Sequence, residues 1–123
     1  MRDGKYVVLT VDDDQDVIDG VTMILEANGY IVESALSAKA GVAAYDACMP
    51  DFVLVDMMME TMAAGIDLAK TLKARGNKPV YMLSSMADGL SQVADPTSQG
   101  LDGLFQKPLN PEALLRTLKS RLA

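Results

Sequence analysis

The chain has 123 residues, of which half are apolar, so it has room for one domain with a single buried core. Its 17 acidic and 11 basic residues give a net charge of −6, which disfavours a nucleic-acid-binding surface because phosphate contacts need clustered Lys and Arg. Histidine is absent, and this excludes Ser-His catalysis, His-containing zinc sites and a phosphohistidine on this chain.

Other features of the sequence indicate where the protein works. No apolar run approaches the roughly 20 residues that cross a bilayer. The amino-terminal residues lack the apolar segment of a signal peptide. The single cysteine, Cys48, excludes an internal disulfide and is expected to be a small packing residue. We therefore predict a cytoplasmic protein without a membrane partner.

Short apolar runs alternate with longer amphipathic stretches in the first half of the chain. Residues 5–11 (KYVVLTV) are almost all apolar and predict a strand that is covered on both faces. Residues 15–28 carry apolar side chains at helical spacing and end before a glycine, which is typical of a helix end. A short strand is predicted at 30–34, followed by a helix at 37–48 that Ser37 caps.

The alternation continues in the second half. The predicted elements are strands at 52–55 (FVLV), 80–83 and 104–106, a helix at 63–75, and a last helix that begins at Asn110-Pro111-Glu112 and carries an apolar stripe to Leu122. Residues 90–99 form the weakest segment, because Pro96 stands where a helix would run. We expect this segment to be short, broken or mobile.

Five strand–helix repeats predict an α/β fold with a doubly wound parallel sheet in the order 2-1-3-4-5. The expected organisation is one domain over residues 1–123, with no output domain. In such folds, binding sites lie at the carboxyl ends of the strands.

Polar residues follow four of the predicted strands. Asp12 and Asp13 follow the first, Asp56 the third, Ser84 the fourth and Lys107 the fifth. Because the carboxyl ends of parallel strands share one edge, these groups are expected to converge. Two carboxylates about 4 Å apart repel by about 4 kcal/mol at an effective dielectric of about 20. Such a cluster calls for Lys107 and a divalent cation such as Mg²⁺ as counter-charges.

The same arrangement suits phosphoryl transfer to Asp56, because carboxylates are established nucleophiles for phosphoryl groups. Each residue alone has a plainer interpretation. Asp12 and Asp13 would serve as turn or helix-capping residues, as Asp14 is expected to do. A serine at the end of a strand, such as Ser84, and a lysine at the surface, such as Lys107, are both common. Only the conjunction of all of them points to phosphoryl chemistry.

These motifs resemble those of the response-regulator receiver family, the aspartate-phosphorylated half of two-component signalling. The matching segments are 8–14 (VLTVDDD), 54–59 (LVDMMM), 79–85 (PVYMLSS) and 105–109 (FQKPL). The resemblance covers nearly the whole chain and implies a flavodoxin-like (βα)5 fold.

The resemblance also implies a role for each residue. Asp56 would accept a phosphoryl group from the phosphohistidine of a histidine kinase or phosphotransfer protein. Ser84 would hydrogen-bond the phosphoryl oxygens, Lys107 would pair with them, and the Lys107–Pro108 bond is a candidate cis peptide. The implied ligands of Mg²⁺ are Asp13, Asp56, the backbone carbonyl of Met58 and, through water, Asp12.

Some positions depart from the family pattern. Glu60 stands where the family usually has proline, and Ala63-Ala64-Gly65 is longer than its usual Asp-Gly turn. Leu104 stands at the position of an aromatic switch residue, and Pro96 interrupts the fourth helix. We therefore expect intact phosphorylation chemistry with an unusual readout by an unknown downstream protein.

Two alternatives stay open. The first is a pseudo-receiver, which has the same fold but acts as a protein-binding module without phosphorylation. The second is a magnesium-dependent phosphohydrolase, but those enzymes carry an acid two residues after the nucleophile, where this chain has Met58. The only enzymatic activities expected of a receiver are self-phosphorylation and slow autodephosphorylation.

Overall fold

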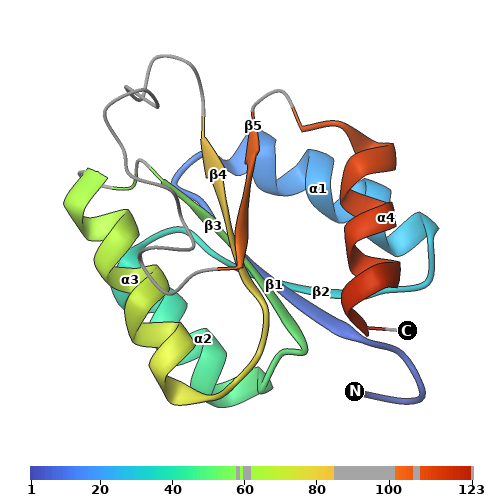
Figure 1. Ribbon diagram of the computed structural model, residues 1–123, viewed down its shortest axis with the longest axis horizontal. Coiled ribbons are helices and arrows are strands. Elements are labelled where there is room, and N and C mark those ends of the chain that lie inside the picture. Colours follow the sequence, from blue (N-terminus) through green and yellow to red (C-terminus); the bar gives the residue numbers. More distant parts are fainter. Residues whose placement is uncertain (58, 60–61, 85–101, 107–108, 123) are drawn as a thin grey trace.

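Strands and helices alternate along the part of the chain that the computed structural model describes, which comprises residues 1–57, 59, 62–84, 102–106 and 109–122 (Figure 1). The strands are β1 (Val7–Val11), β2 (Ile31–Ala35), β3 (Phe52–Asp56), β4 (Val80–Ser84) and β5 (Gly103–Gln106). The helices are α1 (Gln15–Ala27), α2 (Ala38–Cys48), α3 (Met62–Arg75) and α4 (Pro111–Leu122).

The predicted elements within these residues are all present, with ends that differ by at most two residues. The largest difference is at β1, which was expected to begin at Lys5 and begins at Val7. Lys5 instead exchanges backbone hydrogen bonds of 2.8 and 2.9 Å with Arg2, which closes a tight turn before the strand. The segment predicted at 90–99, which includes Pro96, lies outside the described residues.

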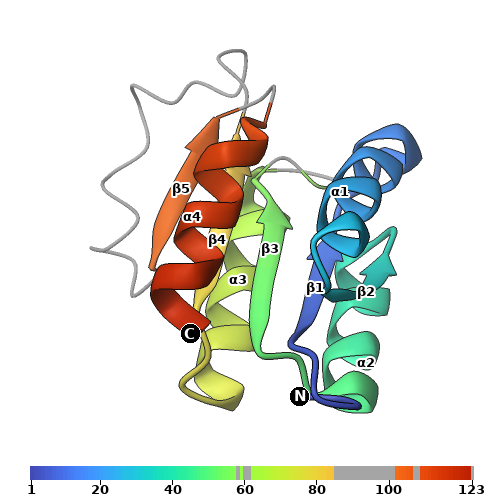
Figure 2. The ribbon, with the colours of Figure 1, turned by 90° about the vertical axis from the view of Figure 1, so that its right-hand side faces the viewer.

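The five strands form one parallel sheet in the order β2-β1-β3-β4-β5, which confirms the predicted topology. All strands point the same way, so the sheet has an amino edge and a carboxyl edge (Figure 2). The N-terminus and the end of α4 lie near the amino edge. The residues that directly follow the strands therefore all lie at the carboxyl edge.

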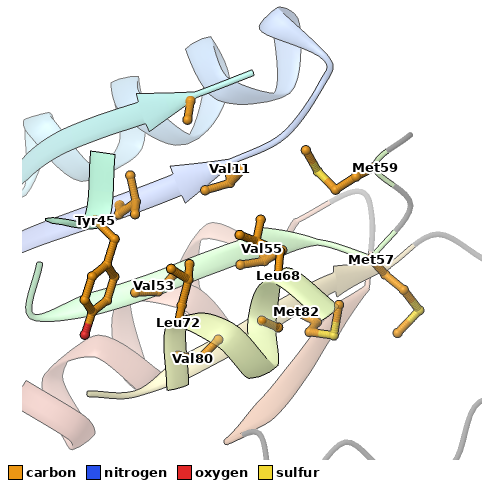
Figure 3. Packing of buried hydrophobic residues seen from close by; sticks show 13 residues of the cluster. Val11, Tyr45, Val53, Val55, Met57, Met59, Leu68, Leu72, Val80 and Met82 are labelled. Atoms are coloured by element: carbon orange, nitrogen blue, oxygen red, sulfur yellow. The ribbon is translucent and has the colours of Figure 1, made fainter. Parts of the chain in front are cut away.

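Helices α2 and α3 cover one face of the sheet. There Val11, Val53 and Val55 of the strands pack with Leu68 and Leu72 of α3 (Figure 3). The neighbouring strand residues point to the other face, because side chains alternate along a strand. All five residues of β1 and of β3 are buried, as a strand covered on both faces requires.

Helices α1 and α4 cover the opposite face. Val8, Phe52 and Leu54 pack there with Leu25 of α1 and Leu118 of α4. Within the described part of the chain, no helix has the length and apolar character needed to span a membrane.

Helix caps confirm three predictions from the sequence. The Asp14 carboxylate accepts the Asp16 N–H at 2.9 Å, and the Ser37 hydroxyl accepts the N–H of the third residue after it at 3.1 Å. Asn110 accepts the Ala113 N–H at 3.1 Å, with Pro111 as the first residue of α4. These side chains satisfy amide groups that a helix leaves without an internal partner, so local sequence fixes where α1, α2 and α4 begin.

Helix α2 ends differently, at a methionine in a left-handed conformation. Met49 has φ 47° and ψ 66°, and the residue is 75% exposed. A side chain in this region costs roughly 1–2 kcal/mol, and glycine usually occupies it.

We expect Met49→Gly to raise the free energy of unfolding by about 0.5–1 kcal/mol, because relief of strain exceeds the extra entropy of glycine in the unfolded chain. Met23 lies within α1 and is 73% exposed, so it makes a matched control. Met23→Gly is expected to lower stability by about 1 kcal/mol. Chemical denaturation of both variants checks the opposite signs, and a loss of stability in Met49→Gly would contradict the assignment of strain.

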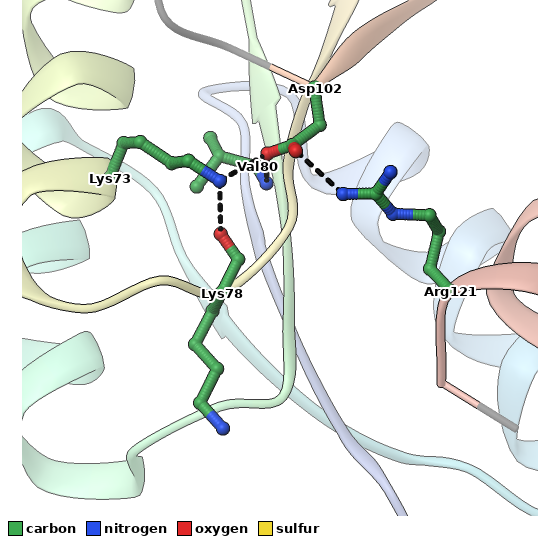
Figure 4. Close-up of polar contacts among 5 residues, drawn as sticks. All are labelled: Lys73, Lys78, Val80, Asp102 and Arg121. Atoms are coloured by element: carbon green, nitrogen blue, oxygen red, sulfur yellow. Dashed lines mark hydrogen bonds and ion pairs between the residues drawn. The ribbon is translucent and has the colours of Figure 1, made fainter.

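At the amino edge of the sheet, one carboxylate joins three elements (Figure 4). Asp102 precedes β5 and accepts hydrogen bonds from Lys73 Nζ at 2.7 Å and from the Val80 N–H at 2.8 Å. A third bond comes from Arg121 Nη2 at 2.6 Å. Asp102 therefore ties α3 and α4 to the beginning of β4.

Candidate functional site

Three carboxylates meet at the carboxyl edge of the sheet. One carboxylate oxygen from each of Asp12, Asp13 and Asp56 can be chosen so that the three lie within 4.8 Å of one another. They come from the ends of β1 and β3, which are adjacent in the sheet. The convergence predicted from the strand order is confirmed for these residues.

Each carboxylate is held in a different way. Asp12 is 1% exposed, its Oδ1 accepts the Asp14 N–H at 2.9 Å, and its own N–H donates to the Ala35 carbonyl at 3.1 Å. Asp56 is 3% exposed and closes β3. Asp13 is exposed. The site therefore combines two carboxylates fixed by the sheet with one that faces solvent.

Ser84 lies at the same edge. It is the last residue of β4, is fully buried, and follows Leu83, the residue that pairs with Asp56. On the neighbouring strand β5, the residue that pairs with Ser84 is Gln106. Lys107 and Met58 lie outside the described residues, so their roles stay predictions.

The chemistry of the cluster fits a divalent cation. Three carboxylates at this spacing repel one another by several kcal/mol unless the charge is offset, and burial of two of them increases the cost. Oxygen ligands are those that Mg²⁺ prefers, and Mg²⁺ needs only one or two carboxylates while it keeps several waters. The residues present are therefore able to hold this ion.

Two other residues with reactive or charged side chains lie away from the cluster. Asp51 is buried at the amino edge, where its Oδ2 accepts the Val7 N–H at 2.8 Å, so it fixes the start of β1. Cys48 is half-buried, and burial, followed by the negative charge of Glu33, raises the pKa of its thiol. A raised pKa disfavours the reactive thiolate.

Two methionines that follow β3 pack in the core: Met57 is 1% exposed and Met59 is 3% exposed. Leu104, at the position of the family's aromatic switch residue, is partly buried and packs against the core on the α2 and α3 face. Its effect on switching stays a prediction.

Sequence reasoning missed a close approach of α3 to the backbone of Asp56 and Met57. Gly65 lies in the first turn of α3, and a Cβ atom added there would lie 2.8 Å from the Asp56 carbonyl oxygen and closer still to that of Met57. The sequence alone marked it only as part of a lengthened turn. Nothing in local pattern predicts a backbone-to-backbone contact of this kind.

Comparison with known proteins identifies the family. The model of the response regulator receiver domain matches residues 8–119. The chain belongs to the response regulator receiver domain family.

Individual relatives agree with this assignment. The chain is 30% identical over 115 residues to the DNA-binding response regulator MtrA of Mycobacterium tuberculosis, in an alignment that covers 94% of this chain and 50% of MtrA. It is 28% identical over 115 residues to the sensory transduction protein RegX3 of Mycobacterium bovis, again with 94% and 50% coverage. The chain thus spans about half the length of the curated relatives it matches.

Two solved structures are similar to nearly the whole of this chain. A CheY-like receiver domain protein from Methanospirillum hungatei superposes with a TM-score of 0.82 and 28% identity, covering 97% of this chain and 94% of that one. The chemotaxis protein CheY4 of Vibrio cholerae gives 0.80 and 26%, with 97% and 100% coverage. Receiver domains are non-enzymatic signalling modules of response regulators, which interact with histidine kinases.

Proposed function

We propose that this protein is a phosphoacceptor switch in which Asp56 accepts a phosphoryl group with the help of bound Mg²⁺. The observation that carries the proposal is the cluster of carboxylate oxygens from Asp12, Asp13 and Asp56 within 4.8 Å at the carboxyl edge. The donor would be the phosphohistidine of a histidine kinase or phosphotransfer protein. These 123 residues contain no histidine, so the phosphohistidine would lie outside them.

In the transfer, a carboxylate oxygen of Asp56 would attack the phosphorus atom. The P–N bond of the phosphohistidine would break, and its electron pair would leave with the imidazole, which takes up a proton. Mg²⁺, when bound, would offset the charge of the carboxylates and of the incoming phosphoryl group, so that one anion can approach another.

The remaining residues would orient the two reactants. Asp13, Asp56 and the carbonyl of Met58 would hold the metal directly, and Asp12 would contact it through water. The Ser84 hydroxyl and the Lys107 ammonium would donate hydrogen bonds to the phosphoryl oxygens. The hydrogen bonds of Ser84 and Lys107 to the phosphoryl group would form only in the phosphorylated state, and they would therefore favour a different surface for a protein partner.

The intact mass of the protein tests the proposal. After incubation with Mg²⁺ and acetyl phosphate, the wild type is expected to gain the mass of one phosphoryl group and then to lose it slowly by hydrolysis. The gain is expected to be absent in EDTA and in Asp56→Asn. Asp67 is an exposed carboxylate on α3, and Asp67→Asn is expected to be phosphorylated like the wild type.

A wild type that gains no mass would contradict the proposal. It would favour the alternative, a receiver fold that binds a protein partner without being phosphorylated. A gain that persists in Asp56→Asn would show that another residue is the acceptor.

A further inference from the structure

Gly65 is a helical glycine that faces backbone rather than solvent or side chains. A Cβ added at this position would lie 2.8 Å from the Asp56 carbonyl oxygen, whereas carbon and oxygen atoms in contact are normally about 3.3–3.6 Å apart. The Met57 carbonyl oxygen lies closer still. Only a residue without a side chain allows α3 to begin this close to the end of β3.

Neither side of this contact has room to retreat. On the strand side, Asp56 pairs in register with Leu83, and the Met57 N–H donates to the Leu83 carbonyl at 2.8 Å. On the helix side, Leu68 and Leu72 hold α3 in the core with 3% and 0% exposure. A side chain at residue 65 would therefore displace the backbone that carries Asp56.

The other helical glycines provide a contrast. Gly20 in α1 has no atom within 4 Å of an added Cβ. Gly41 in α2 would meet side-chain methyl groups of Val11 at 3.1 Å, which are able to adjust. Among the helical glycines in the described part of the chain, Gly65 alone would place an added Cβ against backbone atoms, and these belong to the candidate site.

We propose that Gly65 is a positioning residue: its missing side chain lets the first turn of α3 rest on the backbone of Asp56 and Met57, and this contact sets where the Asp56 carboxylate meets Asp12 and Asp13. The inference rests on the proposed function. A displacement of about 1 Å in a reacting group lowers a rate by up to about 100-fold, so a small backbone shift here has a large effect.

The test uses Gly65→Ala with two readouts. Titration calorimetry with MgCl₂ on the unphosphorylated protein is expected to give weaker binding than in the wild type. The phosphorylation rate from acetyl phosphate at saturating Mg²⁺, followed by intact mass, is expected to fall by about 10- to 100-fold. If Gly65 served only the stability of the fold, its replacement by alanine would change neither the Mg²⁺ affinity nor the phosphorylation rate of the folded protein.

Two matched alanine variants separate an effect on the position of Asp56 from an effect on the stability of the fold. Gly20→Ala, in open space, is expected to keep the wild-type rate within about twofold and to be more stable, because alanine is the better helix former. In Gly103→Ala the added Cβ would lie 2.5 Å from the Tyr81 ring, at the amino edge of the sheet. This variant is expected to be less stable but to keep the wild-type phosphorylation rate.

Each result decides the inference. Wild-type rate and Mg²⁺ affinity in Gly65→Ala would overturn it while the proposed function stands. A wild type that neither binds Mg²⁺ nor accepts a phosphoryl group would instead overturn the proposed function. If Gly65→Ala does not fold, the double variant Gly20→Ala/Gly65→Ala is measured, and failure of both to fold would also overturn the inference, because Gly65 would then serve the fold itself.

Discussion

Asp13→Asn is expected to stabilise the metal-free protein and to remove its stabilisation by Mg²⁺. Asp13 is exposed and adds a negative charge next to the buried carboxylates of Asp12 and Asp56. Because solvent screens an exposed charge, removing it should raise the free energy of unfolding by about 1 kcal/mol, well below the value for a buried pair. In the wild type, a ligand at 100 times its Kd adds about 2.7 kcal/mol, and Asp13→Asn should lose most of this gain.

Chemical denaturation with and without MgCl₂, at constant ionic strength set with NaCl, measures both effects. Asp67→Asn removes an exposed carboxylate of α3 and should respond to Mg²⁺ as the wild type does. The metal site would be refuted if Asp13→Asn and the wild type gained equal stability from Mg²⁺. A metal-free Asp13→Asn protein less stable than the wild type would argue that the carboxylates are already compensated within the fold.

Asp102→Ala is expected to lower the free energy of unfolding by about 3 kcal/mol. The substitution removes the acceptor of three hydrogen bonds, from Lys73, Arg121 and the N–H of fully buried Val80. A hydrogen bond to a charged group contributes about 1.5–3 kcal/mol, but Arg121 is 40% exposed, so its share is reduced by solvent. The variant should still be phosphorylated, because Asp102 lies at the amino edge, away from Asp56.

The contribution of Asp102 should also depend on pH. Partial burial raises the pKa of Asp102, but the hydrogen bonds from Lys73 and Val80 and the charges of Lys73 and Arg121 outweigh it and hold the pKa below its ordinary value. A carboxyl group with a lowered folded pKa stabilises the protein above its unfolded pKa, which is about 3.9, and this stabilisation is lost as the pH falls through the folded pKa.

Denaturation of the wild type and of Asp102→Asn from pH 7 to acid checks this dependence. The difference between them should be constant above about pH 5 and should shrink below about pH 4. Asp46, which pairs with Arg75 on the surface, is the control, and Asp46→Asn should change stability little at any pH. A difference that stayed constant into acid would mean that the Asp102 charge contributes nothing.

Much of the fold follows from local pattern. The apolar runs predicted the strands, and Asp14, Ser37 and Asn110 predicted where three helices begin, because capping is an interaction between residues two or three apart. The strand order followed because short right-handed crossovers leave few topologies. With that order, Asp12, Asp13 and Asp56 had to meet at one edge, so the core of the candidate site was predictable from the sequence.

The contacts that only the tertiary structure revealed involve residues without a distinctive local pattern. Asp102 binds groups 29, 22 and 19 positions away, and it reads in the sequence as an ordinary surface acid before a glycine. The left-handed conformation of Met49 was equally hidden, because residues with side chains rarely adopt it.

The class of fold and the residue types that meet at the carboxyl edge follow from the amino-acid sequence, because hydrophobic period and strand order are properties of the chain. The close approach of α3 to β3 at Gly65, and the bonds of Asp102 to Lys73 and Arg121, come from the packed structure. Those distances depend on how whole helices pack against the sheet, and packing is set by all the buried side chains together rather than by any short segment.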